Sequence, residues 1–181
     1  MTTPFIPAGP DGPRYFTTVD SPIGELLLTG SDEALTGLYM LGGPGARPET
    51  GTGWTRRHGA FGKTITQLRG YFAGELRDFS VPLAPAGTPF QLAVWAELTR
   101  IPYGATTSYG AIARALGKSG AASRAVGAAN GQNPIAVIIP CHRVIGADGG
   151  LTGYGGGLGR KQWLLRLEGA SVAADHAATL W

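Results

Sequence analysis

One segment near the middle of the chain is unsuited to regular secondary structure, and it constrains the fold more than any other feature of the sequence. Residues 82–87 read Pro-Leu-Ala-Pro-Ala-Gly, and this composition cannot sustain a helix or a strand. A helix start follows at once, because Thr88 suits the N-cap, Pro89 suits the first turn and Gln91 completes a capping box. The segment therefore predicts two domains and a flexible tail, at residues 1–87, 88–170 and 171–181.

The first domain carries the pattern of a small sheet with one helix. Short segments rich in β-branched and aromatic residues, bounded by turn residues, predict strands over residues 15–19, 25–29, 35–39 and 79–83. Apolar residues at helical spacing predict one helix over residues 61–76. Joined to a helical second domain, this pattern indicates the mixed α/β (α+β) class.

The second domain has the pattern of two short helices joined by a tight turn. They are predicted over 109–116 and 121–130, with Gly117 and Gly131 at their ends, which is a helix-turn-helix pattern. The second helix reads AASRAVGAAN, and small residues can approach a minor groove about 6 Å wide more closely than long ones. The same composition is typical of a buried, closely packed helix, so composition alone supports both interpretations equally.

The chain has a single cysteine, Cys141. It therefore has no intramolecular disulfide and no cysteine-rich zinc site, and since its three histidines form no metal motif we expect no metal and no cofactor. The apolar run 135–139 predicts a buried strand just before Cys141. His142 and Arg143 follow directly, and cationic neighbours can stabilise the nucleophilic thiolate. A lone cysteine is nevertheless usually inert core, and the local context by itself favours that interpretation.

Charge and hydropathy place few limits on the partner. A net charge of +3 and a pI near 9.2 suit a polyanion such as nucleic acid, but many small proteins carry as much. No apolar run approaches the roughly 18 residues of a membrane span, and the N-terminus lacks the features of a signal peptide. We therefore expect a cytoplasmic protein that does not bind membranes.

Short motifs surround Cys141 in a definite order. They are IPYG at 101–104, SYG at 108–110, RAVG at 124–127, NP at 133–134, IPCHRVIG at 139–146, GYGGG at 153–157 and LEG at 167–169. This set resembles the O6-alkylguanine-DNA alkyltransferases, also called methylated-DNA–protein-cysteine methyltransferases. The resemblance is close over residues 88–169 and looser over 15–83, where a DSPIG turn and a YFAGEL segment carry it. It implies an RNase H-like arrangement for the first domain.

The resemblance implies DNA repair by direct, stoichiometric transfer of an alkyl group. The PCHR cysteine of the family, here Cys141, accepts the group from O6-alkylguanine, and O4-alkylthymine is a second candidate substrate. His142 matches the histidine that deprotonates the cysteine through a water, and Glu168 matches the glutamate that orients this histidine. Tyr109 matches the tyrosine that donates to the guanine ring as the ring becomes anionic.

The resemblance also implies how the damaged base is reached. The nucleotide is rotated out through the minor groove into a pocket that Tyr154 walls on one side. Arg124 matches the arginine that fills the space left in the stack, and Asn133 matches an asparagine hinge after the second helix. The other residues assigned to DNA or substrate are Ala125, Ala128, Ala129, Arg143 and Gly155. Some relatives carry a serine where this chain has Gly155, and the glycine would loosen the pocket toward bulkier adducts.

The implied partner is double-stranded DNA, bound by a monomer, with cooperative binding along DNA left open. Three other functions compete. Alkyltransferase-like proteins bind alkylated DNA but lack the acceptor cysteine, which is present here as Cys141. A cysteine hydrolase usually has its histidine far from the cysteine in sequence, whereas His142 adjoins Cys141. A helix-turn-helix regulator with an inert thiol is the third.

Overall fold

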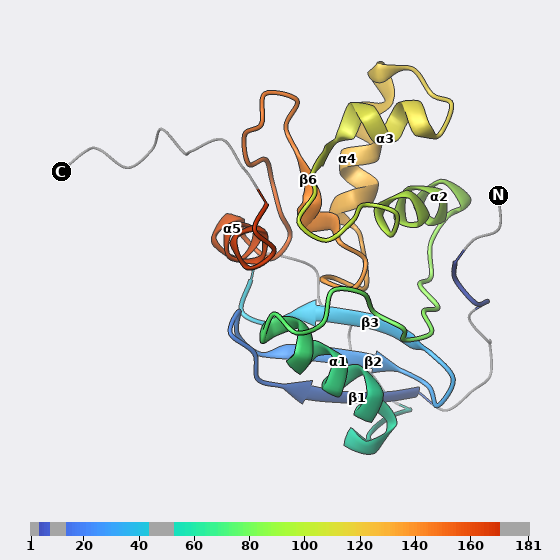
Figure 1. Ribbon diagram of the computed structural model, residues 1–181. Helices are drawn as coiled ribbons and strands as arrows, with labels where there is room; N and C mark the ends of the chain where they lie inside the picture. Colours follow the sequence, from blue (N-terminus) through green and yellow to red (C-terminus); the bar gives the residue numbers. More distant parts are fainter. Residues whose placement is uncertain (1–3, 8–13, 44–52, 171–181) are drawn as a thin grey trace.

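The computed structural model describes residues 4–7, 14–43 and 53–170, and they form a sheet-containing N-terminal domain and a helical C-terminal domain (Figure 1). The mixed α+β class predicted from the sequence is confirmed. The predicted tail at 171–181, which includes His176, lies outside the described residues. Within the described ranges, no helix is long and apolar enough to cross a membrane.

The N-terminal sheet has four strands in the order β3-β2-β1-β4. Their bounds are β1 Arg14–Val19, β2 Leu26–Gly30, β3 Leu35–Met40 and β4 Trp54–Arg56. The first three form an antiparallel meander and lie within one residue of the predicted strands, while β4 runs parallel to β1. Helix α1, Gly62–Phe72, lies across one face of the sheet (Figure 1). It buries Ile65 and Leu68 in the same core as Leu26 and Leu28 of β2.

Two predictions for the N-terminal domain need correction. The helix predicted over 61–76 ends at Phe72, because Gly74 adopts a φ of +76° and its N–H bonds back to the carbonyl of Tyr71. A 3-10 turn, His58–Phe61, precedes it. The strand predicted over 79–83 is wrong, since only Leu83 pairs, in an isolated bridge to Leu35. Proline lacks the N–H that a continuous ladder requires, and Pro82 contributes only its carbonyl, to the N–H of Leu35.

Four helices build the C-terminal domain. They are α2 Pro89–Leu98, α3 Tyr109–Ala115, α4 Ser123–Gly131 and α5 Leu158–Leu167. The smaller elements are strands β5 Thr107–Ser108 and β6 Val144–Ile145, which pair in parallel, and the 3-10 turns Gly120–Ala122 and Cys141–Arg143. The predicted capping box of α2 is confirmed, because Thr88 and Gln91 each bond the other's backbone N–H.

The strand predicted over 135–139 is also wrong, although these residues are largely buried as predicted. The run forms tight turns, in which the Ile138 N–H bonds to the Ala136 carbonyl and Val137 adopts a φ of +70°. A short apolar run signals burial but does not by itself specify a strand. Only its beginning pairs with the sheet, where Leu38 of β3 donates to the Pro134 carbonyl (2.8 Å) and accepts from the Ala136 N–H (3.0 Å).

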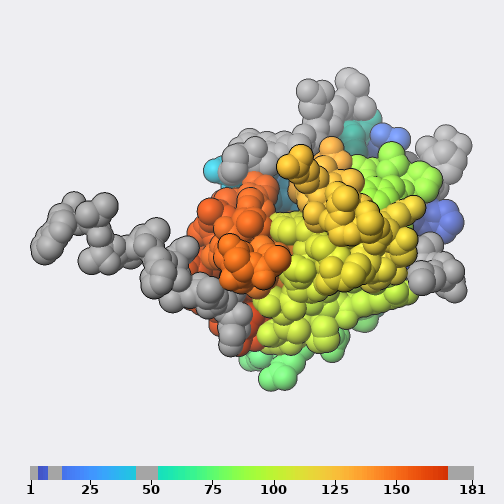
Figure 2. Space-filling model, turned by 90° about the horizontal axis from the view of Figure 1, so that it is seen from above, coloured from blue at the N-terminus to red at the C-terminus, as the bar shows by residue number. Residues whose placement is uncertain are grey.

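The edge of β3 is therefore where the two domains join. The linker pairs along it through Pro82 and Ala84, and the segment that leads to Cys141 pairs along it through Pro134 and Ala136. An edge strand covered in this way has few backbone groups left to bind other chains. Figure 2 shows the molecule from above, where α3 and α4 (yellow) lie beside the loop that follows β6 (orange).

Candidate active site

Cys141 begins the 3-10 turn that follows the buried turns and is only 5% exposed. Asn133 shapes the approach to it, because its Nδ2 donates to the Ile139 carbonyl (2.8 Å) while its Oδ1 accepts from the Ile135 N–H (3.0 Å). Asn130, at the end of α4, donates from Nδ2 to the carbonyl of Cys141 (3.4 Å). The asparagine that was predicted as a hinge thus sets the turn geometry that places the thiol.

The surroundings of the Cys141 thiol act on its pKa in opposite directions. Burial raises the pKa above its ordinary value, while Asn133, the positive charge of Lys161 and the Tyr154 hydroxyl lower it. Burial dominates, so the resting group is the thiol and a base is needed to form the thiolate. The cation beside the thiol is therefore Lys161, and not Arg143 as the sequence suggested.

His142 is completely buried and lies directly beside Glu168. Its Nε2 is 2.8 Å from Glu168 Oε1. Burial lowers the pKa of His142, and this effect outweighs the opposing effect of Glu168, so the imidazole is neutral at neutral pH. Since the carboxylate has no proton to give, Nε2 carries the hydrogen and Nδ1 carries a free lone pair. Among the described residues Nδ1 has no hydrogen-bond partner, which leaves it available as a base.

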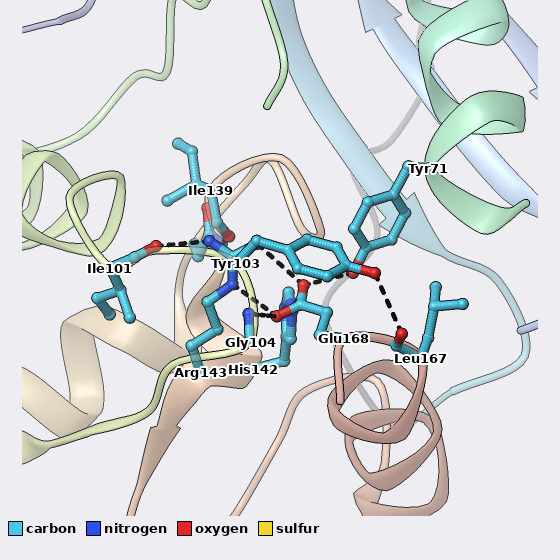
Figure 3. A network of polar contacts seen from close by, with 10 residues as sticks. Tyr71, Ile101, Tyr103, Gly104, Ile139, His142, Arg143, Leu167 and Glu168 are labelled. Carbon is cyan, nitrogen blue, oxygen red and sulfur yellow. Dashed lines mark hydrogen bonds and ion pairs between the residues drawn. The ribbon is translucent and has the colours of Figure 1, made fainter. Parts of the chain in front are cut away.

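The Glu168 carboxylate is the centre of the buried polar network in Figure 3. Tyr71 donates to Oε1 (2.6 Å), Arg143 donates to both oxygens (2.8 and 2.9 Å), and the Gly104 N–H donates to Oε2 (3.3 Å). Although burial by itself would raise the pKa of Glu168, the bonds from His142, Arg143 and Tyr71 lower it to about 2. Glu168 therefore stays ionised and holds His142 in a single orientation.

Arg143 lies inside this network. It is 6% exposed, and besides Glu168 it donates to the carbonyl of Ile101 (2.6 Å). At this position Arg143 is bonded within the protein and not exposed, and its assignment to DNA or substrate binding stays a prediction. A buried guanidinium requires a carboxylate partner, and Glu168 is that partner for Arg143.

Two residues of the site were missed from the sequence. Lys161 of α5 is fully buried, and its Nζ donates to the carbonyls of Val144 (2.6 Å) and Thr152 (2.9 Å). Burial lowers its pKa to about 8. Its spacing of three and four residues from the buried Leu164 and Leu165 placed it on the apolar face of the helix, which was the available signal. Tyr71 is the second residue that was missed. Its position on α1 offered no signal beyond ordinary core packing.

Of the two predicted tyrosines, Tyr154 lines the cavity beside Cys141 and Tyr109 is not among its lining residues. Tyr154 faces Cys141, and its hydroxyl is buried. Tyr109 begins α3, where its ring lies over Gly127 of α4 and its hydroxyl accepts from Thr152 (3.1 Å). A methyl group on Gly127 would lie 3.7 Å from the Tyr109 ring, so the small residues of α4 let the two helices pack closely.

Helix α4 has one buried and one exposed face. Val126, Ala129 and Asn130 are buried, and the carbonyl of Ala129 accepts from the Trp95 indole N–H (2.8 Å). Ala129 is therefore a core residue, and its assignment to DNA or substrate binding stays a prediction. The exposed face carries Arg124, Ala125 and Ala128. The close-packing interpretation of the composition is confirmed for the buried face, and the minor-groove interpretation stays a prediction for the exposed face.

A cavity of about 370 Å³ opens beside the thiol. Cys141, Tyr154 and Gly155 line it on the side of the C-terminal domain. Within the described ranges, no three His, Cys, Asp or Glu side chains gather closely enough to hold a metal ion together. What the site offers is a buried thiol, a neutral imidazole with a free lone pair, an ionised carboxylate that orients it and a buried cation.

Comparison with known proteins gives matches along both domains. The family described as "6-O-methylguanine DNA methyltransferase, DNA binding domain" matches residues 89–170, and its "ribonuclease-like domain" matches residues 14–85. Methylated-DNA–protein-cysteine methyltransferase of Mycobacterium tuberculosis (strain ATCC 25618 / H37Rv) is 55% identical over 161 residues, which are 89% of this chain and 96% of the relative. The Methanosarcina acetivorans protein of the same name is 50% identical and covers 86% of this chain and 99% of its own.

Solved structures agree with these matches. The crystal structure of Mycobacterium tuberculosis OGT in complex with DNA has a TM-score of 0.80 and 55% identity, covering 85% of this chain and 92% of its own. A structure of the O6-methylguanine methyltransferase from the same organism, also with a TM-score of 0.80, is 54% identical and covers 90% of this chain and 96% of its own.

Proposed function

Because the chain belongs to the methylated-DNA–protein-cysteine methyltransferases, a family of DNA-repair proteins, we propose that Cys141 takes the alkyl group from O6-alkylguanine in double-stranded DNA. The observation that carries the proposal is the arrangement around the thiol. His142 is neutral, with Nδ1 free and with Nε2 bound at 2.8 Å to an ionised Glu168. Such a chain of base and orienting group is what an unactivated nucleophile needs.

Activation begins with removal of the thiol proton. Burial keeps Cys141 protonated at rest, so His142 Nδ1 takes the proton through a bridging water as the base approaches. The resulting imidazolium is stabilised by Glu168, whose other hydrogen bonds prevent it from taking the proton itself. Lys161 stabilises the thiolate through the attraction between their charges, while its Nζ is held by the carbonyls of Val144 and Thr152.

The transfer itself is a displacement at the alkyl carbon. The thiolate forms a sulfur–carbon bond as the carbon–O6 bond breaks, and the electron pair remains on the guanine. Tyr109 donates to the ring as this negative charge develops, and Tyr154 forms a wall of the pocket. Nothing in this set of residues can hydrolyse the thioether, so each chain reacts once.

DNA binding is assigned to the helix pair α3 and α4, read as a helix-turn-helix. Its exposed face combines Ala125 and Ala128, small enough for close approach to the minor groove, with the cation Arg124. Flipping the nucleotide costs a few kcal/mol, and Arg124 offsets part of this by occupying the space in the stack. The DNA complex of the M. tuberculosis relative supports DNA as the partner. We propose that the protein acts as a monomer in the cytoplasm, and activity on O4-alkylthymine stays a prediction.

The proposal is tested by measuring how many methyl groups each chain accepts. The protein is incubated with excess duplex DNA that contains O6-methylguanine, and the intact mass is followed with time. We expect a plateau at one methyl group per chain, located on Cys141 by peptide mapping, and no gain for Cys141→Ser. Continued turnover past one equivalent would favour a hydrolase, and an unchanged mass would favour a regulator with an inert thiol.

A further inference from the structure

The cavity beside Cys141 belongs to both domains. Besides the thiol and the Tyr154–Gly156 loop, its walls include Ala136. The last residues of β3, namely Leu38, Tyr39 and Met40, also line it, as do the polar residues Asn130, Gln132 and Asn133. The N-terminal domain, whose residues take no direct part in the proposed transfer, therefore contributes a wall to the reaction site.

The chemistry of the transfer indicates what this space holds. In a displacement, sulfur, carbon and O6 lie in one line, so every substituent on the carbon projects sideways from that line. A methyl group carries only hydrogens there and needs little room. A longer or aromatic alkyl group must extend into space beside the sulfur. In the proposed function the cavity of about 370 Å³ also receives the flipped guanine, so its walls limit the room that is left for the alkyl group.

Met40 of β3 reaches the loop that carries Gly156. A Cβ placed on Gly156 would overlap the Met40 sulfur and would lie 2.8 Å from the Tyr154 ring. Residue 156 can therefore only be glycine while Met40 keeps this position. Methionine is flexible and apolar, which suits a wall that must fit substituents of different shape.

The end of β3 is held firmly in this position. Arg160 of α5 donates from Nη2 to the carbonyl of Leu41 (2.7 Å) and from Nη1 to the carbonyl of Gly156 (3.4 Å). On the other side, Leu38 pairs with Pro134 and Ala136 just before the thiol. Because both flanks of Met40 are bonded to the C-terminal domain, the distance from Met40 to the thiol is set by the fold.

From these contacts we propose that Met40 determines which alkyl groups the protein accepts. The Met40 side chain sets the upper size of the alkyl group that can be transferred. The inference rests on the proposed function and adds a residue that determines its specificity.

The experiment compares two substrates within each variant. Single-turnover rates are measured for O6-methylguanine and O6-benzylguanine in the same duplex, and the benzyl/methyl rate ratio is the readout. A ratio is independent of how much of a variant is folded. In an apolar pocket, a change of one methylene typically alters the rate at least tenfold.

We expect Met40→Trp to lower the benzyl/methyl rate ratio at least tenfold and Met40→Ala to raise it several-fold. Thr36→Val, on the same strand but outside the cavity, should keep the wild-type ratio.

A second pair of variants tests the contact with the loop. Gly156→Ala should lower the ratio, and combining it with Met40→Ala should restore much of the loss, because the methionine is then no longer in the way. This pair decides the question if Met40→Trp does not fold. Ratios that stay at the wild-type value in Met40→Ala and in Gly156→Ala would overturn the inference while methyl transfer continued. Absence of methyl transfer in the wild type would instead overturn the proposed function.

Discussion

At the scale of single residues, the Glu168 carboxylate organises the site, because four other residues direct donors at it from three separate parts of the chain. Its charge compensates the buried Arg143 and fixes the hydrogen of His142 on Nε2. Removing one partner of a buried ion pair leaves the other charge without compensation, which costs far more than the loss of an exposed pair.

Replacing Glu168 with Gln should therefore affect both activity and stability. We expect transfer from O6-methylguanine to slow about 100-fold, because the base loses its orienting group. The loss of stability at pH 7 should be about 3 kcal/mol.

The pKa of Glu168 falls from an ordinary 4.5 to about 2 on folding, so its contribution to stability is complete above pH 4.5 and fades as the pH falls toward 2. The difference in melting temperature between variant and wild type should narrow over that range. Glu75→Gln, at an exposed position, is the control, and a difference that is constant with pH would contradict the assignment.

His142 adds a second pH dependence of the same sign. Burial lowers its pKa in the folded state, so the unfolded chain binds a proton more readily below about pH 6.5. Wild-type stability should accordingly begin to fall below that pH, before Glu168 titrates.

How far the sequence could predict these residues depended on their distance along the chain. The short motifs around Cys141 pointed to His142 and Glu168, which the structure brings together. Tyr71 is 97 residues from Glu168, and a tyrosine at helical spacing is usually a core residue. Lys161 had a local signal, a cation on an apolar helix face, but only the fold could show that it faces the thiol. Arg143 was assigned to DNA or substrate, because sequence patterns do not show which buried charge needs a partner.

At the scale of elements, burial was predictable and backbone geometry was less so. Strands β1 to β3 and the capping box of α2 follow from local pattern, because their signals lie in neighbouring residues. The run at 135–139 has the composition of a buried strand, yet Asn133 holds both of its ends and closes it into turns. A side chain that bonds two backbone groups can override the strand preference of a short segment. Here that outcome points the thiol toward the cavity.

Helix α4 supports a prediction about Arg124, which lies on its exposed face. Arg124→Ala should slow transfer from O6-alkylguanine in duplex DNA at least tenfold, because the flipped state loses the group that fills the stack. Transfer from the free O6-benzylguanine base requires no flipping and should change less than twofold. The measurement is a single-turnover rate on each substrate. Lys118→Ala, which removes another exposed cation in the turn between α3 and α4, should affect both substrates little at low salt. An equal loss on both substrates for Arg124→Ala would mean that the residue supports the fold.

At the scale of the whole molecule, the two domains meet at the thiol and not at a distant surface. Tyr71 of the N-terminal domain donates to Glu168, β3 pairs with the segment before Cys141, and Arg160 donates to the carbonyl that follows Met40. Because residues of both domains line the cavity beside the sulfur, we expect a change at the sulfur to affect contacts between the domains.

We predict that the alkylated protein is less stable than the free thiol form. Cys141 is 5% exposed, and Asn133 and Tyr154 lower the pKa of its thiol, whereas a thioether carries no proton and accepts hydrogen bonds poorly. An added group must also displace Tyr154 or enter the cavity, and overpacking typically costs about 1–3 kcal/mol. In a chain of this length that lowers the melting temperature by roughly 2–12 °C. A benzyl group should lower the melting temperature further than a methyl group, because it reaches Met40 and strains the pairing of β3 with residues 134–136.

The measurement is a thermal melt of protein alkylated to one equivalent, with Cys141→Ser carried through the same treatment as the control. If the alkylated form melts no lower than the free thiol form, the cavity has room for the adduct without strain and the two domains do not sense the reaction.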